Sequence, residues 1–120
     1  MQFMEIVVTE FRRDGVLVVD LAGHVHGHNA DELEERLLGH ADAGEREIVL
    51  NCERLGYISS AGVRVLVVVG KKLKEIGGTM RMSAVNRNVS DILEIAGLSD
   101  SFPVYETEEE AVAAAVSGPA

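Results

Sequence analysis

The chain has 120 residues, 47% of them hydrophobic, and its 20 acidic and 11 basic side chains give a net charge of −9. This length fits one domain with a single core, and the acidic balance argues against nucleic acids and anionic membranes as partners, because both draw affinity from basic residues. The sequence has no apolar run of about 20 residues and no signal-peptide start, so we expect a cytoplasmic protein.

Alternating apolar and polar runs divide the chain into short predicted elements. Apolar and β-branched runs predict strands at residues 4–12, 16–22, 48–50, 80–85 and 104–105. Helical spacing and capping signals predict helices that begin at Asn29, Ser60, Val89 and Thr107 and end near Gly39 or Gly44, Ile76, Gly97 and Val116. The turn Asp14-Gly15 makes the first two strands an antiparallel hairpin.

The segment 60–76 is rich in β-branched residues, which also favour strands. Its length, a cluster of lysines near its end and the following Gly77-Gly78 decide for a helix, because cations stabilise a helix C-terminus. The resulting order ββαβαβαβα implies parallel pairing through crossovers after the hairpin. We therefore predict an α/β fold with a mixed, mostly parallel sheet and about four helices, as one domain over 1–117 with a frayed tail over 118–120.

The segment 55–64 is the most informative part of the sequence, because two hydroxyls meet a predicted helix start there. Ser59 or Ser60 can serve as a helix cap. A second interpretation is a phosphoacceptor, since a phosphate of about −1.5 to −2 charges is tolerated by the unpaired N–H groups of a helix start. A nucleophilic serine is the third, but the segment lacks the G-x-S-x-G elbow and an obvious base, so we expect no enzyme.

Residues 57–64 are similar to the STAS domain family, which includes bacterial anti-sigma factor antagonists. The family pattern is a strand followed by Asp/Ser-Ser-Ser/Ala-Gly at a helix start, and Tyr57-Ile58-Ser59-Ser60-Ala61-Gly62-Val63-Arg64 matches it almost residue for residue. Further similar stretches follow the family's order and spacing, at residues 21–23, 30–37, 77–80, 95–98 and 107–111. The resemblance covers nearly the whole chain and implies the STAS fold.

The resemblance also implies a partner and a switch. Antagonists of this family bind an anti-sigma factor that is also an ATP-dependent serine kinase, and phosphorylation of the antagonist breaks the complex. The acceptor serine of the family maps to Ser60. Ser59 is the second choice, because it stands where many members carry Asp and is itself phosphorylatable, and Asn51 likewise occupies a position where an acidic residue is common.

The same helix is suited to docking by its own chemistry. Its sheet-facing apolar positions leave Val63 and Val67 turned partly outward beside the serines, unless a neighbouring helix covers them. The loop between the second strand and the first helix contributes to the partner surface in the family. The expected partner surface comprises His26, His28, Tyr57, Ser59, Ala61, Gly62, Val63, Arg64 and Val67.

Histidines alternate in His24-Val25-His26-Gly27-His28. In an extended chain three imidazoles on one side can bind a metal, but the motif lacks a carboxylate or thiol, so we favour loop histidines, with partner contact as the middle option. Cys52 follows the apolar run 48–50, and we interpret it as a core filler rather than a nucleophile. We expect no metal and no cofactor.

Two other functions stay open beside the antagonist. STAS domains also serve as accessory subunits of transport machines or parts of stress-sensing complexes, and in this alternative the chain is not regulated by phosphorylation. An enzyme is the remaining hypothesis, and Gly77-Gly78 offers it only a turn rather than a phosphate-binding loop. We expect a monomer or a weak dimer.

Overall fold

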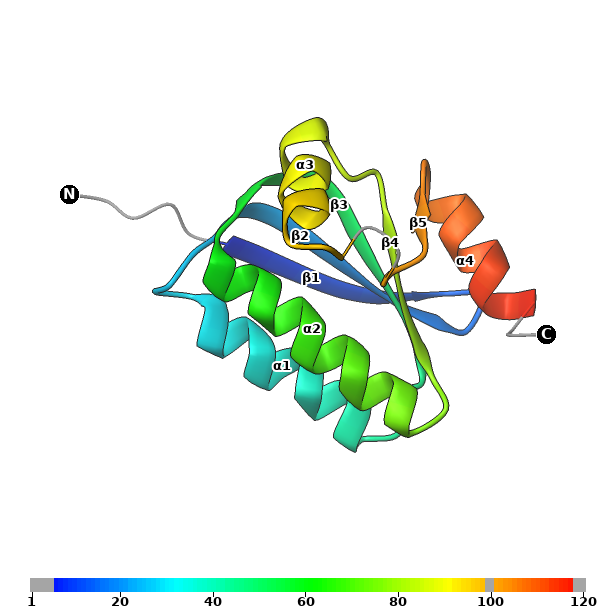
Figure 1. The fold of residues 1–120 in the computed structure, drawn as a ribbon. Coiled ribbons are helices and arrows are strands. Elements are labelled where there is room, and N and C mark those ends of the chain that lie inside the picture. Colours follow the sequence, from blue (N-terminus) through cyan, green and yellow to red (C-terminus); the bar gives the residue numbers. More distant parts are fainter. Residues whose placement is uncertain (1–5, 99–100, 118–120) are drawn as a thin grey trace.

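The computed structural model describes residues 6–98 and 101–117, which form a sheet covered by helices on both faces (Figure 1). In chain order the elements are β1 (Ile6–Arg13), β2 (Val16–Val25), α1 (Ala30–Asp42), β3 (Glu47–Ile58), α2 (Ser60–Glu75), β4 (Thr79–Ser83), α3 (Arg87–Ile95), β5 (Val104–Tyr105) and α4 (Glu108–Ser117). The predicted tail over 118–120 and the predicted strand residues 4–5 lie outside the described residues. Among the described helices, none combines the length and the apolar character that crossing a membrane requires.

The five strands lie side by side in the order β1-β2-β3-β4-β5. β1 pairs antiparallel with β2 through the predicted hairpin, where Asp14 and Gly15 both have positive φ, the geometry that matches the twist of the paired strands. All later neighbours are parallel, because each connection carries a crossover helix or a long loop. The predicted mixed, mostly parallel sheet and the predicted order of elements are confirmed.

Helices cover the two faces of the sheet unequally. α1, α2 and α3 share one apolar core with the sheet, in which Leu21, Leu50 and Leu66 are almost fully buried. α4 closes a smaller apolar cluster on the opposite face, where Ala111 and Val112 pack against valines of β2 and β3. α1 and α2 run next to each other across the larger core (Figure 1).

Two strands are longer than predicted. β2 continues to Val25, so part of the expected connector is strand, and β3 continues to Ile58 instead of ending at residue 50. Val25 pairs with Ile58, and both are buried against the helices. The prediction was too short because the exposed residues Glu53 and Arg54 interrupt the apolar run, although the backbone pairing continues through irregularities in register.

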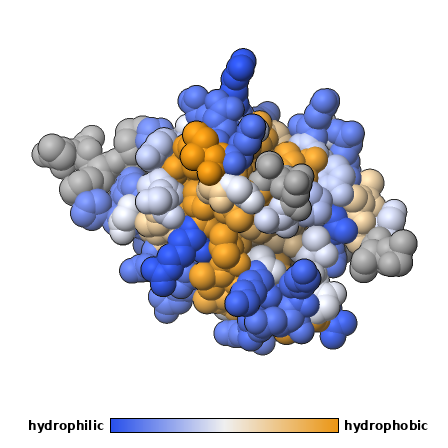
Figure 2. Space-filling view, in the orientation of Figure 1, coloured by the Kyte–Doolittle hydropathy of each residue, from blue (hydrophilic) through white to orange (hydrophobic). Residues whose placement is uncertain are grey.

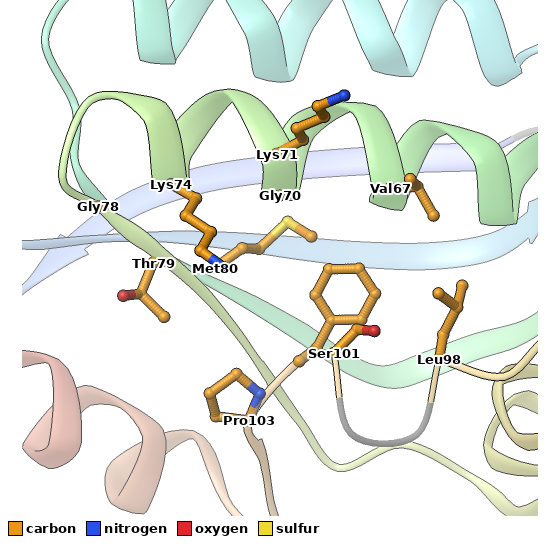
Figure 3. Close-up of a pocket in the computed structure, with 11 residues that line it drawn as sticks. Val67, Gly70, Lys71, Lys74, Gly78, Thr79, Met80, Leu98, Ser101 and Pro103 are labelled. Carbon is orange, nitrogen blue, oxygen red and sulfur yellow. The ribbon is translucent and has the colours of Figure 1, made fainter.

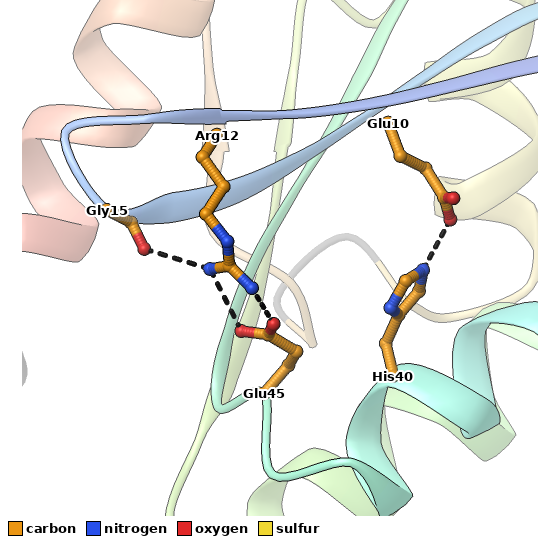
Figure 4. Close-up of polar contacts among 5 residues, drawn as sticks. All are labelled: Glu10, Arg12, Gly15, His40 and Glu45. Atoms are coloured by element: carbon orange, nitrogen blue, oxygen red, sulfur yellow. Dashed lines mark hydrogen bonds and ion pairs between the residues drawn. The ribbon is translucent and has the colours of Figure 1, made fainter.

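The edge strand β1 is tied to α1 and the loop after it by ion pairs (Figure 4). Glu10 accepts a hydrogen bond from Arg36 at 3.0 Å and also pairs with His40, while Arg12 pairs with Glu45. The Arg36 hydrogen bond and then His40 hold the pKa of Glu10 below its usual value, against the opposing effect of burial. Each exposed pair stabilises the fold by less than about 1 kcal/mol, so their role is to fix the edge.

α4 is fastened at its first turn. Thr107 caps it as predicted, because its hydroxyl accepts the Glu110 backbone N–H at 3.1 Å. Glu108 then receives two donors, the Asn51 amide at 2.9 Å and the Arg13 guanidinium at 2.8 Å. Asn51 therefore binds a carboxylate across the sheet, a role that an acidic side chain could not fill in its charged form.

Candidate docking site at the start of α2

The junction between β3 and α2 gives its two serines different surroundings. Ser59 has an extended backbone and takes the cap position, where its hydroxyl accepts the Gly62 N–H at 3.3 Å. Its own N–H donates to the Val25 carbonyl at 2.8 Å, which anchors the cap to the end of β2. Ser59 is therefore a structural residue, half-buried and engaged on both sides.

Ser60 is the first residue of α2 and is exposed. Its hydroxyl makes no hydrogen bond to any residue that the structure describes. The first turn contains no acidic residue, and the exposed Arg64 lies four positions further along the same side of the helix. A helix start with unpaired N–H groups and a nearby cation can accept an anion on Ser60 without loss of the helix.

Gly62 holds the start of α2 against the sheet. A Cβ at this position would lie 2.5 Å from Cγ1 of Ile58 and 2.7 Å from Cγ1 of Val25. No side chain fits that space, so the helix approaches the ends of β2 and β3 as closely as only glycine allows. This contact fixes the height of Ser60 above the sheet.

A hollow of about 270 Å³ opens beside Ser60, and we call it the serine hollow. Its lining residues come from the end of β3, the start of α2, and α3 with the residue after it: Tyr57, Ile58, Ser60, Val63, Ile92, Ile95 and Ala96. None of these described lining residues is charged, and Ile95 is 86% exposed on the rim. Figure 2 shows hydrophobic surface gathered over α3 and the middle of α2, between hydrophilic regions.

α3 completes the hollow because one asparagine holds it in place. The Asn86 side chain donates to the Leu55 carbonyl at 2.7 Å and accepts the Val89 N–H at 2.9 Å. The first contact reaches β3 and the second caps α3. Ile92 and Ile95 line the same hollow as Val63, and neither isoleucine belongs to the predicted partner surface.

The end of β2, just before the loop that leads to α1, lies next to Tyr57. The His24 ring meets the Tyr57 ring edge-on, with centroids 6.2 Å apart. Asn29 occupies the predicted cap position of α1 but makes no side-chain cap hydrogen bond. Its side chain instead accepts the His26 N–H at 3.0 Å and donates to the His24 carbonyl at 2.9 Å. Both hydrogen bonds stabilise the loop rather than the helix start.

Of the remaining candidates, Val63 lines the serine hollow and the others are not among its lining residues. His26 and His28 stack edge-on with centroids 5.5 Å apart in the same loop, and within the described residues no three histidine, cysteine, aspartate or glutamate side chains are placed to hold a metal ion. Val63 is almost covered, at 9% exposure, whereas Val67 is 39% exposed and lines a different cavity. Ala61 is half-buried against the core.

Cys52 lies in the core, as its place after an apolar run indicated. Its side chain is fully buried, and burial raises the pKa of its thiol to about 12. Burial therefore disfavours the thiolate, which is the nucleophilic form of a cysteine. The interpretation of Cys52 as a core filler is confirmed.

Comparison with known proteins gives the family. Residues 9–111 match the family model described as the STAS domain. A protein of Bordetella bronchiseptica named as a candidate anti-sigma factor antagonist, BtrV, is 42% identical over 84% of this chain and 87% of its own length. An anti-sigma F factor antagonist of Paenibacillus polymyxa is 30% identical over 82% of this chain and 85% of its own.

Solved structures share the fold. An anti-sigma factor antagonist from Mycobacterium paratuberculosis superimposes with a TM-score of 0.82 at 23% identity, covering 91% of this chain and 92% of its own. Unphosphorylated SpoIIAA gives 0.80 at 20% identity over 97% and 100% of the two chains, and the phosphorylated form from Bacillus gives 0.70 at 20% over 91% and 97%. With its sequence relatives and its fold in agreement, the chain belongs to the STAS domain family, in the group of the anti-sigma factor antagonists.

Proposed function

We propose that this chain binds an anti-sigma factor that is also a serine kinase, and that phosphorylation of Ser60 releases it. The observation that carries the proposal is the position of Ser60, exposed at the head of α2 and on the rim of a hollow whose described lining residues are uncharged. A hydroxyl at this point is open to a kinase and adjoins apolar groups that suit a protein partner. The chain acts as a docking module in the cytoplasm rather than as an enzyme.

The proposed partner surface is centred on the serine hollow. Tyr57 and Ile95 are both large and exposed, and both line the hollow, as anchor residues around a pocket do. The surface is extended by the cap and first turns of α2, by the loop before α1, and by α3 with the residue after it. These residues are Ser59, Ala61, Gly62, Val63, Arg64, Val67, His26, His28, Ile92 and Ala96. The partner's contribution is an apolar side chain seated in the hollow.

Phosphate on Ser60 acts against that contact. It brings about −1.5 to −2 charges to the edge of a hollow whose occupant excludes water, and desolvating an unpaired charge costs several kcal/mol. In the unbound protein the same phosphate is hydrated and lies next to the N–H groups of the helix start. The modification therefore weakens the complex while the fold stays intact.

Ser60 is favoured over Ser59 as the acceptor. The Ser59 hydroxyl accepts the Gly62 N–H, and its half-buried position lies against the end of β2. A kinase that used Ser59 would have to remove a cap worth about 1 kcal/mol from α2. Ser60 has no such contact to lose.

The relatives support this direction. A fold alone does not define a function, since many folds host several. Here, however, two sequence relatives that cover most of the chain are named as anti-sigma factor antagonists, and SpoIIAA, a structural neighbour, has been solved both with and without phosphate. These names favour a phosphorylation-regulated antagonist over a transporter subunit.

The proposal is tested with the anti-sigma factors of the kinase type that are encoded in the same genome, beginning with any beside this gene. Each purified kinase is incubated with this protein and ATP, and the phosphate is located by mass spectrometry of peptides spanning residues 55–64. We expect one phosphate on Ser60, none on Ser60→Ala, and binding in the absence of ATP. Phosphate on Ser59 alone, or no binding to any of these kinases, contradicts the proposal.

A further inference from the structure

A second cavity, of about 770 Å³, lies at the other end of α2. We call it the lysine cavity. It is formed by the outer side of α2, the start of β4 and the segment that leads into β5, and it is lined by Val67, Gly70, Lys71, Lys74, Gly78, Thr79, Met80, Leu98, Ser101, Phe102 and Pro103. Its volume falls within the range of about 300 to 1,000 Å³ that is typical of small-molecule sites.

The lysine cavity is polar at one end and apolar at the other. Lys74 and Thr79 lie together at the end near the turn into β4, and Val67 and Leu98 lie together at the opposite end (Figure 3). Met80, only 2% exposed, forms part of the floor between them. A ligand that fills this space needs a polar head and an apolar body in one line.

Lys74 supplies the charge of the polar end. Its side chain extends from α2 down toward Met80, whereas the Lys71 amine turns away toward α1 (Figure 3). Within the described residues no carboxylate pairs with Lys74, and no acidic side chain lines the cavity. The neighbouring hollow between α1 and α2 differs, because Asp42 and Glu75 line it beside Lys72. Among the described lining residues Lys74 therefore meets no counter-charge, in a chain whose net charge is −9.

The apolar wall is preformed. Phe102 is 7% exposed and packs directly on α2 at Gly70, where an added Cβ would lie 2.7 Å from its ring. The missing side chain at Gly70 lets the Phe102 ring contact the helix backbone, so this part of the wall is held on α2. A wall fixed in this way needs no rearrangement to accept a ligand, which lowers the cost of binding.

We infer that the lysine cavity binds a small amphipathic anion, a molecule with an apolar chain and a carboxylate or phosphate head, with the head on Lys74 and the chain along Val67, Leu98 and Phe102. The charge of Lys74 selects the anion, and the apolar end selects against small inorganic ions. This site does not include Ser60, since the two cavities share no lining residue, and Val67 is the residue that it has in common with the proposed partner surface.

The experiment is an NMR titration of the whole protein with sodium octanoate, octyl phosphate, 1-octanol and sodium acetate, which separates the carboxylate from the phosphate head. We expect shifts of the Gly70, Gly78 and Thr79 amides, with one of the two anions binding about tenfold more tightly than octanol because it gains a charge-assisted contact. Acetate should give no saturable shift. Octanol binding as tightly as both anions, or shifts centred outside the cavity, overturns the inference.

Variants sharpen the test. Lys74→Met keeps the length of the side chain and should reduce the affinity for the octyl anion about tenfold, to that of octanol. The affinity for octanol itself should not change. Lys72→Met is the matched control, because Lys72 pairs with Asp42 outside the cavity, and it should change neither affinity. Leu98→Gln should weaken both ligands. Equal losses in Lys74→Met and Lys72→Met would assign the effect to overall charge and refute the site.

Discussion

The two ends of α2 each border a cavity, and the cavities differ in charge. At the N-terminal end none of the described residues that line the serine hollow is charged, and the chain offers a hydroxyl on its rim. At the C-terminal end the described lining of the lysine cavity includes cations and no acidic residue. One end of α2 thus borders an apolar hollow, where an added negative charge disfavours contact with an apolar partner group. The other end borders a cavity whose lysines attract negative charge.

The side-chain charges match the helix dipole at only one of the two ends of α2. Lys72 and Lys74 lie in the last turn, where the dipole favours cations. The first turn lacks the acidic residues that the dipole would favour there, although α1 and α4 both have them. An uncharged helix start leaves room for a charge that is added later, which is what a phosphorylation switch requires.

The largest expected effect is on partner binding at the serine hollow. Ile95→Asp should weaken binding of the anti-sigma factor about 100-fold, since it places an unpaired carboxylate in the buried contact. Stability should change by less than about 0.5 kcal/mol because Ile95 is 86% exposed. Titration calorimetry measures the affinity.

The matched control for Ile95→Asp is Val116→Asp, which adds the same charge at a 58% exposed position on α4, on the other face of the sheet. It should leave the affinity unchanged. Equal weakening by both variants would mean that net charge rather than the serine hollow governs binding.

The next effect is on the fold at the N-terminal end of α2. Gly62→Ala should lower the free energy of unfolding by about 1 to 3 kcal/mol, because the added methyl group overlaps Ile58 and Val25. Urea unfolding followed by circular dichroism measures it. Gly39→Ala in α1 meets no atom within 4 Å and should instead stabilise the protein by about 0.5 to 1 kcal/mol. An unchanged free energy of unfolding in Gly62→Ala would show that α2 does not contact the sheet closely at this position.

Alanine substitutions of the two serines should differ by a smaller amount in their effect on the free energy of unfolding. Ser59→Ala should cost about 1 kcal/mol of unfolding free energy, because it removes the cap of α2. Ser60→Ala should change stability by less than about 0.5 kcal/mol, since its hydroxyl makes no contact in the described structure. The same urea experiment compares the two variants. A larger loss of unfolding free energy in Ser60→Ala than in Ser59→Ala would mean that Ser60 rather than Ser59 caps the helix.

The smallest effect tests the charges at the two ends directly. Ser60→Asp should raise the free energy of unfolding by about 0.3 to 1 kcal/mol, because an anion at the helix start is favourable. Lys74→Glu should lower it by a similar amount at the opposite end. Both changes should shrink as salt is added. A destabilising Ser60→Asp would mean that the helix start does not accommodate an anion.

The sequence predicted most elements because hydrophobic periodicity and turn residues are local signals. The lysines and Gly77-Gly78 identified α2 against its β-branched composition, and the hairpin followed from Asp14-Gly15. Local signals did not reveal the second half of β3, where exposed charged residues stand in a strand that is held by pairing with β2.

The candidate site was predictable in part. The junction of β3 and α2 was identified, but which serine caps the helix depends on backbone geometry that both residues could adopt. The contribution of α3 was missed because it depends on the long-range hydrogen bond from Asn86 to Leu55. The available signal was Ile95, an exposed isoleucine that falls outside the i, i+3, i+4, i+7 spacing of Val89, Ile92, Leu93 and Ala96.

The central claim is that negative charge on Ser60 separates the chain from its partner. The direct measurement is the affinity of the anti-sigma factor that binds this protein, determined by calorimetry for the unmodified protein and for protein carrying phosphoserine at position 60, with circular dichroism to show that both are folded. The account predicts that the phosphorylated form binds at least about 100-fold more weakly at unchanged secondary structure. Equal affinities of the two folded forms would contradict it.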